Sequence, residues 1–188
     1  MINGVKLPKY KSISKTKRIG FYNKPKYVYV PLVSGKDTDI TITVKKGDYV
    51  YKGSVIGRRK GDYKISICSS ISGTVIDYVQ RTISTGEKAK CVVIENDFKE
   101  KEEIKEVVNK KINQYTKEEF LKTLKDCGVV GMGGNEFPTY LKYKTNEKIN
   151  TLIVNCTECS AYSTSDYVLL QERSEEILET IDSILEIN

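Results

Sequence analysis

The residues best suited to binding chemistry lie in a glycine-rich segment, residues 127–143. Its glycines Gly131, Gly133 and Gly134 let the backbone approach a ligand closely and turn amide N–H groups toward a phosphate. Lys142 follows and supplies a positive partner for the same phosphate. The spacing therefore predicts a phosphate-binding loop, although a glycine loop alone does not identify the ligand.

A second set of polar residues follows an apolar run at residues 151–155, which is predicted to be a strand. Asn155 and Glu158 lie at its carboxyl end, where open α/β sheets place their ligands. We therefore expect this strand end and the glycine loop to face one pocket.

Two cysteines, Cys156 and Cys159, form a C-x2-C pair in the same segment. Such a pair is a redox dithiol, half of a metal site, or two small side chains that pack together. The sequence contains no histidine and no second C-x2-C pair to complete a tetrahedral zinc site. We therefore expect no metal and prefer the packing interpretation.

Composition narrows the chemistry further, because the 188 residues include no histidine and no tryptophan. A serine or cysteine nucleophile activated by histidine, a histidine zinc site and an imidazole base are all excluded. What remains is a bound cofactor that carries its own chemistry, or work by carboxylates, lysines and thiols. We predict no catalytic side chain in this chain.

Cysteine usage and hydropathy bear on the location of the protein. Five unevenly spaced cysteines argue against a disulfide framework and for reduced thiols. No stretch approaches the roughly 18 to 20 apolar residues that a membrane span needs, and the N-terminus does not read as a secretory signal. We expect a cytoplasmic protein without direct membrane insertion.

The net charge of +6 is concentrated near the N-terminus, where residues 1–30 carry eight basic and no acidic side chains. Aromatic residues between these charges would suit nucleic-acid binding with base stacking. The preferred interpretation is a basic leader, residues 1–25, that docks on an acidic partner or on the acidic C-terminal half of the same chain. We expect no nucleic-acid partner.

Residues 26–98 predict an all-β domain, because short runs rich in tyrosine and β-branched residues alternate with turn residues. The predicted strands are 27–33, 39–44, 49–51, 64–68, 74–79 and 90–95. Gly47 and Gly53 occupy tight turns within V-x-x-G-D-x-V-x-x-G. S-G-T-V at residues 72–75 repeats the arrangement of a turn followed by a strand. This pattern resembles the barrel-sandwich (biotinyl/lipoyl-like) domain.

A carrier domain of that kind attaches its cofactor to an exposed lysine at a hairpin tip. Lys60 lies in the corresponding turn, without the methionines that flank the modified lysine in biotinyl domains. We interpret Lys60 as an ordinary surface lysine and the domain as a structural module.

Residues 99–188 predict a partial α/β domain. The apolar stripe of a first helix consists of Ile104, Val107, Val108 and Ile112. A capping box at residues 116–119 opens a second helix, and two more are predicted, one beginning near Ser165 and one over residues 174–187. The single strand at 151–155 is less than half of a doubly wound sheet, so we expect a longer chain or a partner to supply the missing strands.

The order of these parts resembles the N-terminal half of the RnfC family, over roughly residues 26–187. A biotinyl-like module is followed by G-V-x-G-x-G-G-x-x-F-P-T-x-x-K, then by L-I-x-N-x-x-E-C-x-x-Y and by a helix near Q-E-R-x-E-E-I. RnfC is a subunit of ion-translocating ferredoxin:NAD oxidoreductases, and a similar protein serves the clostridial proline reductase system. The flavin-bearing, NADH-oxidising subunit of respiratory complex I is similar, more distantly.

The resemblance implies an α+β fold, with an N-terminal barrel-sandwich hybrid domain followed by a partial Rossmann-like domain that binds FMN and NADH. In that family the reaction is hydride transfer from NADH to the flavin, followed by release of single electrons to iron–sulfur clusters. By this resemblance, the residues expected to contact the phosphate are Gly131, Gly133, Gly134 and Lys142. Asn155 and Glu158 would meet the flavin or the nicotinamide.

The chain departs from the family pattern at two places. Glu136 stands where the family usually has the last glycine of G-G-A-G-F-P-T, so a carboxylate would face a phosphate. Ser160 and Ala161 replace the glutamate and proline of E-C-E-P-Y, and the glutamate is the family's residue beside the nicotinamide. Both departures bear on the binding of NADH.

The sequence therefore predicts an RnfC-like electron-transfer protein, or its N-terminal portion, that is not active alone. The C-x2-C-x2-C-x3-C-P runs of cluster-binding proteins are absent, so we expect no iron–sulfur cluster in this chain. The expected partners are other subunits of a redox complex, which would place it in the cytoplasm or at the cytoplasmic face of the membrane. The alternative is a non-catalytic docking or scaffold module of a redox complex, for example of a proline reductase system.

Overall fold

The computed structural model describes residues 8, 10–22, 24–33, 39–61, 63–103, 112–132, 136–147 and 149–187. Contacts between residues divide the chain into two compact units. The larger unit is Asn23–Asn146, and the smaller unit combines Met1–Tyr22 with Glu147–Asn188.

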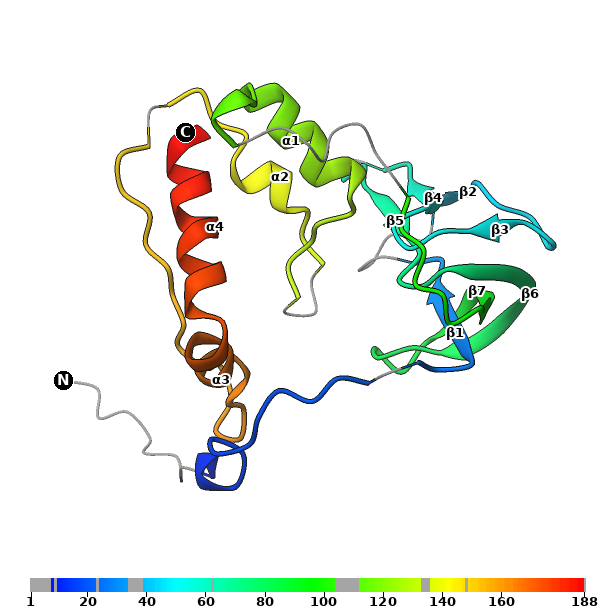
Figure 1. Cartoon of the computed structure of the whole chain (residues 1–188), viewed down its shortest axis with the longest axis horizontal. Helices are drawn as coiled ribbons and strands as arrows, with labels where there is room; N and C mark the ends of the chain where they lie inside the picture. Colours follow the sequence, from blue (N-terminus) through cyan, green and yellow to red (C-terminus); the bar gives the residue numbers. More distant parts are fainter. Residues whose placement is uncertain are drawn as a thin grey trace. The chain divides into compact units, whose positions relative to one another are not determined.

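The larger unit contains two antiparallel sheets (Figure 1). The four-stranded sheet has the order β1-β7-β6-β3 and consists of β1 (Tyr27–Pro31), β7 (Lys88–Asn96), β6 (Gly73–Thr82) and β3 (Tyr49–Val50). The three-stranded sheet has the order β2-β4-β5 and consists of β2 (Ile40–Ile42), β4 (Val55–Arg59) and β5 (Ser66–Cys68). All six strand runs predicted from the sequence contain a strand, whereas β4 is not among the predictions.

The core of this domain lies between the sheets, where β-branched and leucine side chains alternate with outward-facing polar ones. Its buried members are Leu32, Val50, Ile56, Val75, Val92 and Ile94. The two motif glycines hold the turns that bring the strands together, because Gly47 and Gly53 have φ angles of 95° and 90°. The Gly47 N–H donates to the carbonyl of Val75 at 2.8 Å, which ties the first turn to β6.

A buried serine and a carboxylate join three strand ends of the larger sheet. Ser72 Oγ donates to Asp97 Oδ1 at 2.6 Å, and the Tyr49 hydroxyl donates to Asp97 Oδ2. The Lys99 N–H also donates to Asp97 Oδ1, at 2.9 Å. The hydrogen bonds from Ser72 and then Tyr49 lower the pKa of Asp97 from 3.8 to about 2.

Four α-helices and two short 3-10 turns complete the described chain. They are η1 (Lys11–Ile13), η3 (Ile112–Gln114), α1 (Lys117–Asp126), α2 (Thr139–Lys142), α3 (Ser165–Glu172) and α4 (Ser174–Ile187). The predicted capping box is confirmed, since Thr116 Oγ1 accepts from the Glu119 N–H and Glu119 Oε2 accepts from the Thr116 N–H. The predicted starts of α3 and α4 are confirmed as well. Ile104, Val107 and Val108 lie outside the described residues.

The predicted strand at residues 151–155 is wrong. Described residues 149–164 contain neither helix nor strand, and Ile153 and Val154 are 86% and 48% exposed. A strand needs a neighbour to satisfy its backbone N–H and C=O groups, and the described part of the smaller unit offers no other strand. The apolar pattern of residues 151–155 is therefore not sufficient to make them a strand. The described residues do not show a Rossmann-like sheet.

The cluster around Asp97 predicts a pH dependence of stability. A carboxyl whose pKa falls from 3.8 to about 2 on folding stabilises the protein above pH 4, and this stabilisation is lost as the pH falls toward 2. Urea unfolding between pH 6 and pH 2 should show that loss, and Asp97→Asn should lower stability at pH 6 and flatten the decline. Asp182→Asn, on an exposed position of α4, is the control. Parallel curves for wild type and Asp97→Asn would contradict this assignment.

Candidate cofactor-binding site

The glycine loop begins at a turn that is anchored on the β domain. Gly128 follows α1 with a φ of 70°, and a Cβ there would overlap the carbonyl oxygen of Ser66 in β5. Only glycine fits this left-handed, closely packed position. Arg58 supports the same contact, because its Nη1 donates to Ser66 Oγ at 3.1 Å and lies 3.7 Å from Asp126 Oδ1.

The two sides of the loop pair with each other at its base. Val130 forms an antiparallel bridge with Pro138, the Gly131 N–H donates to the Phe137 carbonyl at 2.9 Å, and the Thr139 N–H donates to the Val129 carbonyl at 3.0 Å. Pro138 is fully buried and directly precedes α2 as its N-cap residue. Gly133 and Gly134, predicted as phosphate contacts, lie outside the described residues.

The structure brings Gly131 and Lys142 together. A Cβ built on Gly131 would lie 3.9 Å from Lys142 Nζ, so the ammonium group is beside the loop backbone. Lys142 is the last residue of α2 and is exposed. A cation next to a glycine backbone matches the pairing that the sequence predicts for a phosphate site.

Aromatic contacts support the loop from both sides. The rings of Tyr63 and Phe137 meet edge to face, with centroids 5.5 Å apart, which links the β4–β5 connection to the loop. Lys125 lies over the ring of Tyr140, whose pKa burial raises. Phe137 belongs to the predicted motif, whereas Tyr63 carried no signal in the sequence, because its contact spans 74 positions of the chain.

Glu136 adopts a backbone conformation that favours glycine. Its φ is 46°, in the left-handed region, and the family pattern has a glycine at this position. The residue is half-buried and lines a cavity of about 600 Å³ together with Cys127, Gly128 and Val130. Glu136 therefore differs from the family's glycine in two ways. It adds a carboxylate, and it places a residue with a side chain in a backbone conformation that favours glycine.

Asn155 and Glu158 lie in the smaller unit, where both close local turns. Asn155 Oδ1 accepts from the Thr157 N–H at 2.9 Å. Glu158 Oε1 accepts from the N–H groups of Asp166 and Tyr167, at 2.9 and 3.2 Å, and so caps the start of α3.

The pKa of the Glu158 carboxyl reflects this capping role. Desolvation acts to raise the pKa, but hydrogen bonds from Ser163 and the two backbone N–H groups, with the charge of Lys11, lower it below its ordinary value. Glu158 is thus an anionic acceptor near neutral pH. Cys156 and Cys159 on the same loop are half-buried and exposed, respectively, outside any disulfide.

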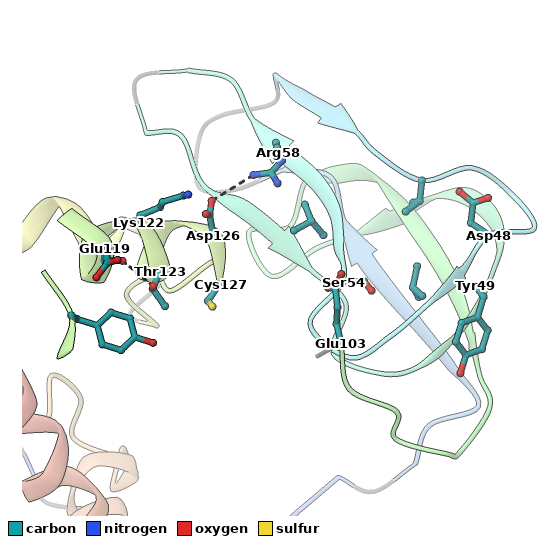
Figure 2. A pocket seen from close by; sticks show the side chains of 14 residues that line it. Asp48, Tyr49, Ser54, Arg58, Glu103, Glu119, Lys122, Thr123, Asp126 and Cys127 are labelled. Carbon is teal, nitrogen blue, oxygen red and sulfur yellow. Dashed lines mark hydrogen bonds and ion pairs between the residues drawn. The ribbon is translucent and has the colours of Figure 1, made fainter. Parts of the chain in front are cut away.

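A larger cavity of about 950 Å³ lies between the β domain and α1, and none of the predicted site residues that the structure describes line it (Figure 2). Arg58 points toward Asp126 across it, and Glu119, Lys122 and Thr123 project from α1. Charges of both signs thus face it, and Arg58 already pairs with Asp126. We therefore keep the glycine loop as the candidate site, although this cavity has the size of a ligand pocket.

Comparisons with known proteins agree with the order of the two parts. Residues 1–99 match the family described as the RnfC barrel sandwich hybrid domain, and residues 124–188 match the Nuo51 FMN-binding domain. The homologous subunit of the Na(+)-translocating ferredoxin:NAD(+) oxidoreductase complex of Acetobacterium woodii is 29% identical over 93% of this chain and 40% of its own length. The homologous subunit of the ion-translocating oxidoreductase complex of Pasteurella multocida is 32% identical over 94% of this chain and 21% of its own length.

The chain thus joins a barrel-sandwich domain to a glycine loop in a segment that is similar to an FMN-binding domain. The chain belongs to the RnfC family, as the motifs indicated. It spans well under half the length of the curated relatives it matches. None of the helices in the described part of the chain is long and apolar enough to cross a membrane.

The backbone at position 136 yields a stability prediction. Glu136→Gly should stabilise the protein by about 0.5–1 kcal/mol, because the left-handed strain of a non-glycine residue exceeds the added freedom of the unfolded chain. Glu136→Gln keeps the strain and removes only the charge, so it should show no such gain. Urea unfolding of both variants measures the difference. A glycine variant no more stable than the glutamine variant would show that the φ of 46° is not strained.

Proposed function

We propose that this chain is an RnfC-like electron-transfer protein whose glycine loop binds the phosphate of FMN. The observation that carries the proposal is the ammonium group of Lys142 beside the backbone of Gly131, in a segment that matches an FMN-binding domain. Bound FMN would supply the chemistry, since a flavin accepts a hydride and releases single electrons. The chain itself would bind and orient it.

The described part of the loop has two of the parts that a phosphate needs, an open backbone and a nearby cation, whereas the Gly131 N–H itself donates to the Phe137 carbonyl. The backbone of Gly131 carries no side chain that would block approach, and the base of the loop is held by hydrogen bonds to Phe137 and Thr139. Lys142 supplies a point charge for the phosphate oxygens. Gly133 and Gly134 belong to the same proposed contact by their place in the motif.

Asn155 and Glu158 are proposed to meet the flavin or nicotinamide side of the cofactor. Glu158 uses Oε1 for the two N–H groups of α3, and an ionised carboxylate has further acceptor positions on its other oxygen. The local turn at Asn155 and the helix cap at Glu158 would hold both side chains in fixed orientations. NADH is proposed as the hydride donor on the strength of the family resemblance.

The wider assignment is also a proposal. We divide the chain into the leader 1–25, a barrel-sandwich domain 26–98 and a partial α/β flavin domain 99–188. The names of the relatives, each a subunit of a complex, support other subunits of a redox complex as partners. The proposed location is the cytoplasm or the cytoplasmic face of the membrane. The second candidate is a docking module of such a complex, for example in a proline reductase system, and the carboxylate of Glu136 in the phosphate loop favours it.

Lys142 separates the two candidates. Lys142→Ala should weaken FMN binding about tenfold or more, because a charge-assisted hydrogen bond contributes about 1.5–3 kcal/mol. Titration of the full chain with FMN, followed by quenching of the flavin fluorescence, measures this. Lys144→Ala, an exposed lysine two positions beyond α2, is the matched control and should bind as the wild type does. Equal affinities for all three proteins would overturn the phosphate assignment and favour the docking module.

A further inference from the structure

The N-terminal leader packs within the smaller unit, although the family match assigns it to the barrel-sandwich part. The ring of Tyr10 stacks on the ring of Tyr162, with centroids 4.7 Å apart and planes 4° from parallel. Ser14 Oγ donates to the carbonyl of Tyr162 at 3.4 Å. The sequence left two partners open for this leader, an acidic partner protein and the acidic C-terminal half of the same chain. The structure shows contacts with the C-terminal part of the chain.

Charge complementarity accompanies these contacts. The Ile19 N–H donates to both carboxylate oxygens of Glu172, at 3.2 and 3.3 Å. Lys11 contributes to the electrostatic stabilisation of the Glu158 carboxylate, and Arg173 lies over the ring of Phe21. Leader residues thus contact Glu158, which caps the start of α3, and Glu172 and Arg173 at its end.

The loop that receives the leader has little structure of its own. Residues 155–164 form no helix or strand, and their side chains mostly close short local turns, such as Ser160 Oγ accepting from the Tyr162 N–H. Within the described part of the chain, the long-range contacts on Tyr162 come from Tyr10 and Ser14. This loop carries Asn155 and Glu158, the residues proposed to meet the flavin or nicotinamide, together with Tyr162, which receives the leader.

We propose that leader residues 10–19 act as a strap that fixes the conformation of the 155–162 loop, and that Tyr10 is a positioning residue for cofactor binding by that loop. The proposal rests on the proposed function of Asn155 and Glu158. Without the strap, the loop gains conformational freedom that cofactor binding must then remove. The leader therefore belongs to the smaller unit in structure and contributes to the cofactor binding proposed for its 155–162 loop.

Two measurements on the full chain test the strap. In Tyr10→Ala, hydrogen exchange of the Asp166 and Tyr167 amides, which Glu158 holds, should be faster than in the wild type. FMN affinity should fall about 2- to 12-fold, the range expected for one aromatic pair. Tyr10→Phe keeps the ring and should restore both values. Tyr22→Ala, which removes a leader tyrosine that is 89% exposed, should change neither.

The outcomes are distinguishable from failure of the proposed function. Unchanged exchange in Tyr10→Ala would overturn the strap, whether or not FMN binds. Faster exchange with unchanged FMN affinity would overturn the positioning role of Tyr10. If the wild type binds no FMN, the proposed function fails and the positioning role fails with it, while the exchange measurement still decides the strap.

Discussion

The placement of the candidate site depends on one close contact, between the backbone of Gly128 and the carbonyl oxygen of Ser66. The left-handed turn at Gly128 ends α1 and directs the following residues back toward α2. Any side chain at this position would push α1 away from β5. The ion pair of Arg58 with Asp126 and the edge-to-face contact of Tyr63 with Phe137 act on the same junction.

This junction connects the β module to the segment that matches an FMN-binding domain. The β4–β5 region of the barrel-sandwich domain contacts both the start of the glycine loop and its return side. The loop base is then closed by its own backbone pairing at Val130 and Pro138. If the loop binds a phosphate, as proposed, these contacts with the barrel would lower the entropic cost of ordering it.

The parts that the sequence predicted are those with local physical causes. Turn glycines such as Gly47, the capping box of Thr116 and Glu119, and the alternating strands were recognisable from residue type and spacing. Lys142 was likewise expected near Gly131, and a short helical turn brings the two together. The run at 151–155 failed for the opposite reason, since whether an apolar segment becomes a strand depends on a neighbour that its own residues do not encode.

Long-range contacts were beyond the reach of pattern reasoning. The stacking of Tyr10 on Tyr162 and the contact of Tyr63 with Phe137 join residues far apart in the chain, and neither Tyr10 nor Tyr63 belongs to a motif of the sequence. Glu158 shows a further difficulty: the residue expected to meet the cofactor also caps α3. Its variants would therefore alter the fold and the site together, so they cannot by themselves test the function.

The central claim is that this chain recognises a flavin by its phosphate, and the most direct measurement compares FMN with riboflavin, which lacks the phosphate. Both ligands would be titrated into the full chain at low and at moderate ionic strength, with flavin fluorescence as the readout. We expect FMN to bind at least about tenfold more tightly than riboflavin, and added salt to reduce this difference in affinity. Equal affinity for the two flavins, or no binding of FMN at millimolar concentration, would contradict it.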